Sequence, residues 1–121
     1  MNKEEYIKAL EELNLPKSEF IILSGGSLVM RGLRDKTADL DLCFSKKLAE
    51  EIDLYSAPVD DKGFYTPFEN CQVMDEFERI EFDEVDGYQC ESLKSILAFK
   101  EKARRPKDFK DIERIKEFLK H

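Results

Sequence analysis

The chain has 121 residues and a formal net charge of −7, with 41% hydrophobic and 39% charged residues. This length predicts one domain over residues 1–121, large enough for one hydrophobic core. The acidic balance argues against general nucleic-acid binding, which needs a basic surface to displace counterions from phosphates, and no apolar run is long enough to span a bilayer.

Hydrophobic spacing predicts alternating helices and strands in the N-terminal half. We expect an amphipathic helix over residues 2–14, with Asn2 and Glu5 as a capping pair. A strand over 20–23, a glycine turn with a short helix, a strand over 38–44 and a helix over 46–52 capped by Ser45 follow. Residues 54–70 contain Pro58, Gly63 and Pro67 without a sustained period, so we interpret them as a segment that shapes a substrate rim.

The C-terminal half is predicted to hold three strands and two helices. Strands are expected over 71–74, 77–83 and 88–90, with Ile80 facing the core and a turn at Asp86-Gly87. Ser92 is expected to cap one helix, Arg105-Pro106 to break it, and Asp108 to cap the last helix, with Asp111 in its first turn. This order predicts an α+β fold: a small mixed sheet, helices packed on one face, and an open face that carries carboxylates.

Cysteine and histidine usage narrows the chemistry. Cys43, Cys71 and Cys90 are odd in number and lack metal-site spacing, and the N-terminus lacks the apolar region of a signal peptide. We therefore expect free thiols in a cytoplasmic protein, with Cys43 and Cys90 in the core. The only histidine is the last residue, His121, so catalytic triads built on histidine are not expected. Carboxylates, lysines, arginines and a metal remain.

Two adjacent features suit a nucleotide. Gly25 and Gly26 follow the first strand and allow a sharp turn, and Ser27 is expected to cap the helix behind it. Free N–H groups at such a helix start favour phosphate. On the second strand, Asp39 and Asp41 share one face opposite Leu40 and Leu42, which is a suitable arrangement for a hard divalent cation.

The order Gly-Gly-Ser, helix, loop and Asp-Leu-Asp resembles the nucleotidyltransferase superfamily, which includes DNA polymerase β and small antibiotic nucleotidyltransferases. The match is strongest over residues 20–44 and weaker over 91–119, where Leu97-Ala98-Phe99-Lys100, Arg105-Pro106-Lys107-Asp108 and Asp111-Ile112 look like the tail of bacterial relatives. The resemblance implies a minimal nucleotidyltransferase fold.

The resemblance also implies an activity and its cofactors. It predicts transfer of a nucleoside monophosphate, AMP in the first instance, from ATP or another nucleoside triphosphate to a hydroxyl on a small molecule or a protein. Two Mg²⁺ ions would be held by Asp39, Asp41 and a third carboxylate. Arg79-Ile80-Glu81-Phe82 resembles the strand that carries this third group, with Glu81 in place of aspartate. Asp83 is the next choice, followed by Glu78 and Asp75.

Further residues are assigned to the nucleotide. Gly25, Gly26 and Ser27 would hold the β- and γ-phosphates, Arg31 or Arg34 would meet phosphate charge, and Lys100 resembles a family lysine that reaches the triphosphate. Aromatic residues of the rim either stack on a base or cover the core, and they are Phe64, Tyr65 and Phe68.

Two alternatives to an enzyme remain. A catalytically weak or inactive module could act in a toxin–antitoxin pair or bind another partner, since the third carboxylate departs from aspartate. A nucleotide sensor without turnover is the other alternative. If the protein is an enzyme, the chain supplies only the core of larger relatives, so we expect a homodimer or a partner protein to complete the cleft.

Overall fold

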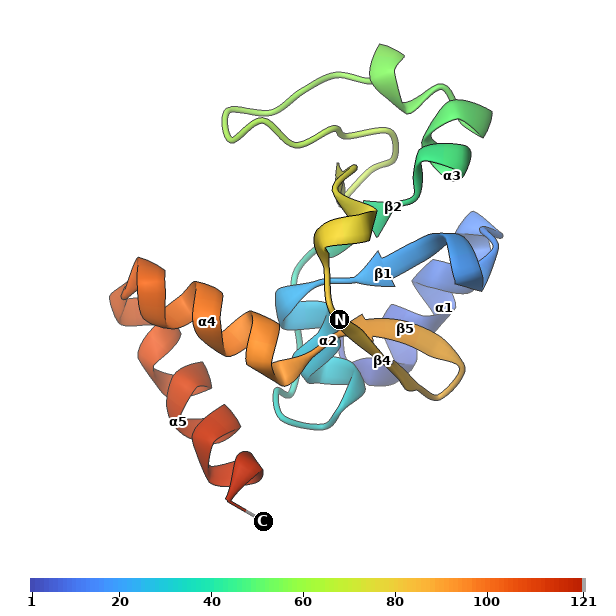
Figure 1. Ribbon diagram of the computed structural model, residues 1–121. Helices are drawn as coiled ribbons and strands as arrows, with labels where there is room; N and C mark the ends of the chain where they lie inside the picture. The colour runs from blue at the N-terminus through green and yellow to red at the C-terminus, as the bar shows by residue number, and fades with distance from the viewer. Residues whose placement is uncertain (121) are drawn as a thin grey trace.

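A computed structural model describes residues 1–120 (Figure 1). The described chain has an α+β fold, as predicted, with five α-helices and a five-stranded open mixed sheet. None of the described helices combines the length and apolar character needed to cross a bilayer. The elements are α1 (Lys3–Leu13), β1 (Phe20–Ile22), α2 (Ser24–Met30), β2 (Leu40–Phe44), α3 (Lys46–Glu51), β3 (Cys71–Met74), β4 (Phe82–Val85), β5 (Tyr88–Glu91), α4 (Leu93–Ala103) and α5 (Phe109–Leu119).

The sheet places three chain segments at one edge. Its strand order is β3-β2-β1-β5-β4, in which β1 runs antiparallel to β2 and parallel to β5. Ile22 pairs with Leu42 on one side and with Cys90 on the other. The carboxyl ends of β1 and β5 therefore meet the amino end of β2, and the residues just beyond these ends become neighbours.

The main core lies under one face of the sheet. Leu40, Leu42 and Phe44 alternate along β2 and point into it, together with side chains from α1, α2 and α3. Asp41 and Cys43 occupy the intervening positions and face the other side, as strand alternation requires. The predicted placement of Cys43 and Cys90 in the core is confirmed, and both are free thiols.

The opposite face is only partly open. Ile21, Leu23 and Cys43 are buried there against a short segment that contains Phe77 and Ile80. A separate apolar cluster joins α2 to the α4–α5 pair, which lies to one side of the sheet in Figure 1. The carboxylate-bearing part of this face thus sits between that short segment and the C-terminal helices.

The predicted strand over 77–83 is wrong in its first part. Phe77–Arg79 forms a single 3₁₀ turn, and β4 begins only at Phe82. In a 3₁₀ turn, positions three apart lie on the same side, so Phe77 and Ile80 can both pack on the cluster around Cys43. Ile80 therefore covers the face opposite the main core. Over so few residues, the three-residue spacing of a 3₁₀ turn is hard to distinguish from the two-residue alternation of a strand.

Helix α2 begins earlier than predicted. It starts at Ser24, so Ser27 lies inside the helix and does not cap it. Gly26 instead allows a close approach between α2 and α1, because a Cβ there would clash with the Tyr6 hydroxyl and lie 2.8 Å from Ile22 Cγ2. The predicted caps Asn2, Ser45 and Ser92 all accept the expected backbone N–H bonds.

Candidate functional site

A pocket of about 630 Å³ opens at the end of the sheet where the carboxyl ends of β1 and β5 meet the amino end of β2. Its walls come from the ends of these strands, from the α4–α5 hairpin and from the segment 57–70, drawn in yellow-green in Figure 1. Charged side chains of both signs line the pocket in equal number, beside apolar ones. The cations are Arg34, Lys62, Lys100, Arg105 and Lys107, and the carboxylates are Asp39, Asp41, Glu91, Asp108 and Asp111.

Asp39 and Asp41 both line this pocket. Asp41 lies on β2, but Asp39 lies just before it, because β2 begins at Leu40 and not at Ala38 as predicted. The Asp41 backbone carbonyl accepts a hydrogen bond from Leu23 N at 2.9 Å, which fixes its position beside the end of β1. Burial raises the pKa of the Asp41 carboxyl to about 6, and the neighbouring charge of Asp39 adds to the increase. Lys62 and Arg34 lower it. The two carboxylates therefore repel each other in a partly desolvated place.

This carboxylate pair is the candidate ligand set for a hard divalent cation. Mg²⁺ takes oxygen ligands and is usually held by one or two carboxylates, with substrate phosphates and water completing its octahedron. Within residues 1–120, no group of three or more aspartate, glutamate, cysteine or histidine side chains comes together at metal-binding distance. Asp39 and Asp41 would thus supply the protein ligands, and a bound cation would relieve their repulsion.

Glu81 lies outside the lining of the pocket. Its side chain is exposed, and its backbone carbonyl accepts a hydrogen bond from Ser92 N at 2.8 Å. The predicted strand position that would have aimed Glu81 at the metal is absent, because β4 starts one residue later. The other candidates for a third carboxylate also lie outside the lining, and they are Asp83, Glu78 and Asp75.

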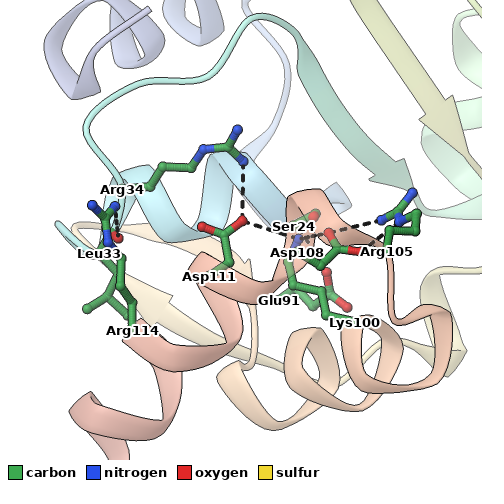
Figure 2. Close-up of polar contacts among 9 residues, drawn as sticks. All are labelled: Ser24, Leu33, Arg34, Glu91, Lys100, Arg105, Asp108, Asp111 and Arg114. Carbon is green, nitrogen blue, oxygen red and sulfur yellow. Dashed lines mark hydrogen bonds and ion pairs between the residues drawn. The ribbon is translucent and has the colours of Figure 1, made fainter.

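Glu91 is the acidic residue at the pocket that sequence reasoning missed. Although it carries a carboxylate, it is buried at the end of β5. Its Oε1 accepts from Ser24 N at 2.9 Å (Figure 2). Its Oε2 accepts from Ser95 Oγ at 2.6 Å, so Glu91 joins the start of α2 to α4. In the sequence, the only signal for Glu91 is an acidic residue at the end of an apolar strand. Its role follows from the parallel pairing of β1 with β5, which brings the carboxyl ends of these two strands together.

The predicted phosphate turn contributes one of its three residues to the pocket. Gly25 lines it, and a Cβ there would lie 2.8 Å from Arg34 Nη1 and 3.0 Å from Thr37 Oγ1. Gly26 faces α1, and the buried Ser27 hydroxyl donates to the Glu91 carbonyl at 2.8 Å. Gly26 and Ser27 are therefore structural residues, which pack α2 against α1 and bond it to β5.

The two candidate arginines have different surroundings. Arg31 Nη2 donates to Asp83 Oδ2 and to the Glu91 carbonyl, each at 3.1 Å, and so ties α2 to the β4–β5 hairpin. It lies outside the lining of the pocket. Arg34 lines the pocket, with Nη1 at 3.8 Å from Asp111 Oδ2 (Figure 2). Arg34 is therefore the arginine placed to meet a ligand.

Lys100 is buried at the pocket wall among charged partners (Figure 2). Its Nζ lies 3.0 Å from Asp108 Oδ1 and 3.4 Å from Asp111 Oδ2, and only 4% of its side chain is exposed. Of these two contacts, only the one to Asp108 is a hydrogen bond. Burial raises the pKa of Asp108, but hydrogen bonds from Arg105 and Lys100 outweigh it and hold this pKa below its usual value.

The predicted capping by Asp108 is wrong. Its side chain makes no capping bond to α5. It points back toward Lys100 on α4 and toward the turn after this helix, where Arg105 Nε donates to Oδ2 at 2.6 Å. Asp108 and Asp111 thus position Lys100 and Arg105.

The rim aromatics divide between pocket and core. Phe64 is half-buried and lines the pocket. Tyr65 packs edge to face on Tyr55, with ring centroids 5.6 Å apart, and both Tyr65 and Phe68 contact the main core. Of the three residues considered from the sequence, Phe64 alone is placed to touch a ligand.

No protein-family model, no curated protein and no solved structure matches this chain. The likeness to nucleotidyltransferases therefore depends on the residue pattern of 20–44 and 91–119. The function must be argued from the pocket itself.

Proposed function

We propose that this protein is a Mg²⁺-dependent nucleotidyltransferase. It would transfer a nucleoside monophosphate, AMP in the first instance, from a nucleoside triphosphate to a hydroxyl group. One observation carries the proposal: Asp39 and Asp41, a mutually repelling pair, line the same pocket as Arg34, Lys100 and Lys107. Carboxylates for a cation and cations for phosphates are the two parts that this reaction needs.

One set of side chains would bind the metal, and another would bind the triphosphate. Asp39 and Asp41 would hold Mg²⁺, which when bound neutralises phosphate charge and makes the acceptor hydroxyl a better nucleophile. Lys100, held by Asp108 and Asp111, presents a fixed positive charge to the triphosphate. Such prepositioned charges stabilise a phosphoryl-transfer transition state because they need not reorganise during the reaction.

The reaction joins the acceptor oxygen to the α-phosphorus and releases pyrophosphate. Arg34 and Lys107 line the pocket and would neutralise the charge of the leaving group. Glu91 uses both carboxylate oxygens in hydrogen bonds to Ser24 and Ser95. It is therefore a positioning residue that holds the start of α2 against α4.

Nucleotide binding tests the proposal first. Calorimetry with ATP should show binding in the presence of Mg²⁺ and none in its absence. The double variant Asp39→Asn, Asp41→Asn should lose this binding, whereas the matched carboxylate variant Glu81→Gln should retain it because Glu81 lies outside the pocket lining. Absence of Mg²⁺-dependent nucleotide binding in the wild-type protein would overturn the proposal.

Turnover is the second test. Each labelled nucleoside triphosphate is incubated with the protein, Mg²⁺ and a panel of hydroxyl acceptors, and pyrophosphate release is followed. Release that depends on an acceptor and disappears in the double variant supports the enzyme. Tight Mg²⁺-dependent binding without release across the panel instead favours the non-catalytic module, a sensor or partner-binding protein.

A further inference from the structure

The contacts described so far account for the metal and the phosphates of a nucleotide, and for its base they offer only the half-buried Phe64. Phe99, on α4, immediately precedes Lys100 and also lines the pocket. Its side chain is 57% exposed, which leaves a large apolar ring facing solvent at the pocket wall. An exposed aromatic beside a phosphate-binding lysine has the chemistry of a stacking surface.

Arg105 holds this ring from one side. Its guanidinium carbon lies 5.5 Å from the centroid of Phe99. The guanidinium is itself fixed by two hydrogen bonds to Asp108, Nε to Oδ2 at 2.6 Å and Nη2 to Oδ1 at 3.3 Å. Asp108 thus prepositions Arg105 and Lys100 together, and Arg105 supports the Phe99 ring before any ligand arrives.

The other exposed rings of the C-terminal helices lack this setting. Phe109 and Phe118 on α5 are about as exposed as Phe99, at 50% and 51%, but neither lines the pocket. Phe64 lines the pocket from the segment 57–70 and is half-buried. Phe99 is therefore the most exposed aromatic side chain in the pocket wall.

We propose that Phe99 is the stacking surface for the base of the bound nucleotide. This inference rests on the proposed function and adds a subsite to it. Stacking uses the π-face that every base presents, so it raises affinity with little discrimination among bases. The protein should therefore bind a nucleoside triphosphate more tightly than a triphosphate without a base.

Calorimetry with two probes tests the subsite: ATP and inorganic tripolyphosphate, each with Mg²⁺. The wild-type protein should bind ATP about tenfold more tightly than tripolyphosphate, a typical effect of one aromatic stack. Phe99→Leu should remove this difference without changing the affinity for tripolyphosphate, and Phe99→Trp should keep it. Phe109→Leu is the matched control. It removes a similarly exposed aromatic ring from the adjacent helix and should leave the affinities for both probes at their wild-type values.

The outcomes separate this inference from the proposed function. Equal affinity of the wild-type protein for both probes, or an unchanged ATP preference in Phe99→Leu, overturns the stacking surface and leaves the nucleotidyltransferase proposal standing. Loss of tripolyphosphate affinity in Phe99→Leu also overturns it, because the change would then act on the phosphate site. If neither probe binds with Mg²⁺, both proposals fail.

Discussion

Asp41 is held in an unfavourable environment by its neighbours. Its backbone is fixed beside Leu23, and its carboxylate is partly desolvated next to Asp39. Without a cation, the charged form of Asp41 is therefore penalised, which is why its pKa rises to about 6. A residue kept in such a state at the mouth of a pocket is typical of binding sites, where stability is given up for a ligand.

Replacing Asp41 should stabilise the protein in the absence of metal. The folded-state pKa of Asp41, about 6, exceeds its usual value of 3.8, so the folded protein binds more protons and loses stability as pH rises through this window. At pH 7, Asp41→Asn should raise the free energy of unfolding by about 1–2 kcal/mol, after allowance for solvent screening. Urea denaturation at pH 7 and pH 4 measures this, and the gain should vanish at pH 4.

The exposed variant Glu84→Gln is the control for this comparison and should change stability little at either pH. Mg²⁺ affinity of the wild-type protein should fall as pH drops below 6, since the cation requires the ionised carboxylate. Destabilisation by Asp41→Asn at both pH values would contradict the repulsion between Asp39 and Asp41.

Gly26 and Tyr6 form a second pair that can be tested at the residue scale. Tyr6 is fully buried, and within the described residues its hydroxyl has no hydrogen-bond partner. Gly26→Ala should destabilise the fold by about 1–3 kcal/mol, because the added methyl overpacks against that hydroxyl. Tyr6→Phe alone should be neutral or slightly stabilising, since it removes an unpaired polar group.

The double variant should recover part of the loss, and urea denaturation of all four proteins gives the coupling energy. Additive effects of the two changes would show that the methyl meets the Ile22 side chain rather than the hydroxyl.

At the scale of elements, the α4–α5 hairpin is the part that builds the cationic wall. Arg104 ends α4 in a left-handed conformation with φ of 48°, and a 3₁₀ turn over Pro106–Asp108 leads into α5. This turn brings Asp108 back beneath Lys100, where the two form an almost fully buried ion pair. The hairpin geometry therefore depends on charges as well as on apolar packing.

Removing this buried ion pair should lower the free energy of unfolding more than removing an exposed ion pair. Asp108→Asn should destabilise the protein by about 3–5 kcal/mol at pH 7, because it leaves Lys100 charged and less well paired. The lowered pKa of Asp108 means that its contribution is present above its usual pKa and is lost as the pH falls further. The cost of the variant should therefore shrink in acid.

Chemical denaturation measures the cost, and Lys116→Met is the control. It removes an exposed pair on the same hairpin, Lys116 Nζ to Glu101 Oε1 at 3.2 Å, and should cost under about 1 kcal/mol. Equal costs for the two variants would mean that the buried pair adds nothing beyond surface electrostatics.

Sequence reasoning found the elements whose signals are local. Strand alternation placed Asp41 on the face opposite Leu40 and Leu42, and the Arg105-Pro106 break separated the last two helices. It failed where contacts between elements decide the role of a side chain. Glu91 joins α2 to α4 because β5 lies parallel to β1, a pairing between strands far apart in the chain. Asp108 binds Lys100 and Arg105, eight and three residues away, and does not cap α5.

On the scale of the whole molecule, the pocket exists only when the chain is fully folded. Its lining comes from the ends of β1 and β5, the start of β2, the segment 57–70 and the hairpin of α4 and α5. Contacts between segments so far apart form late and cooperatively in folding. The pocket therefore depends on segments from both halves of the described chain.

The charge of this molecule shapes how a nucleotide would arrive. The lining of the pocket is balanced, but the chain as a whole carries −7, so an approaching polyanion meets repulsion before it reaches Lys100. Dissolved ions shorten the range of that repulsion to about 8 Å at physiological ionic strength. Stopped-flow capture of ATP should consequently become faster as sodium chloride is raised, and a rate that falls with salt would mean that the local cations already guide the encounter.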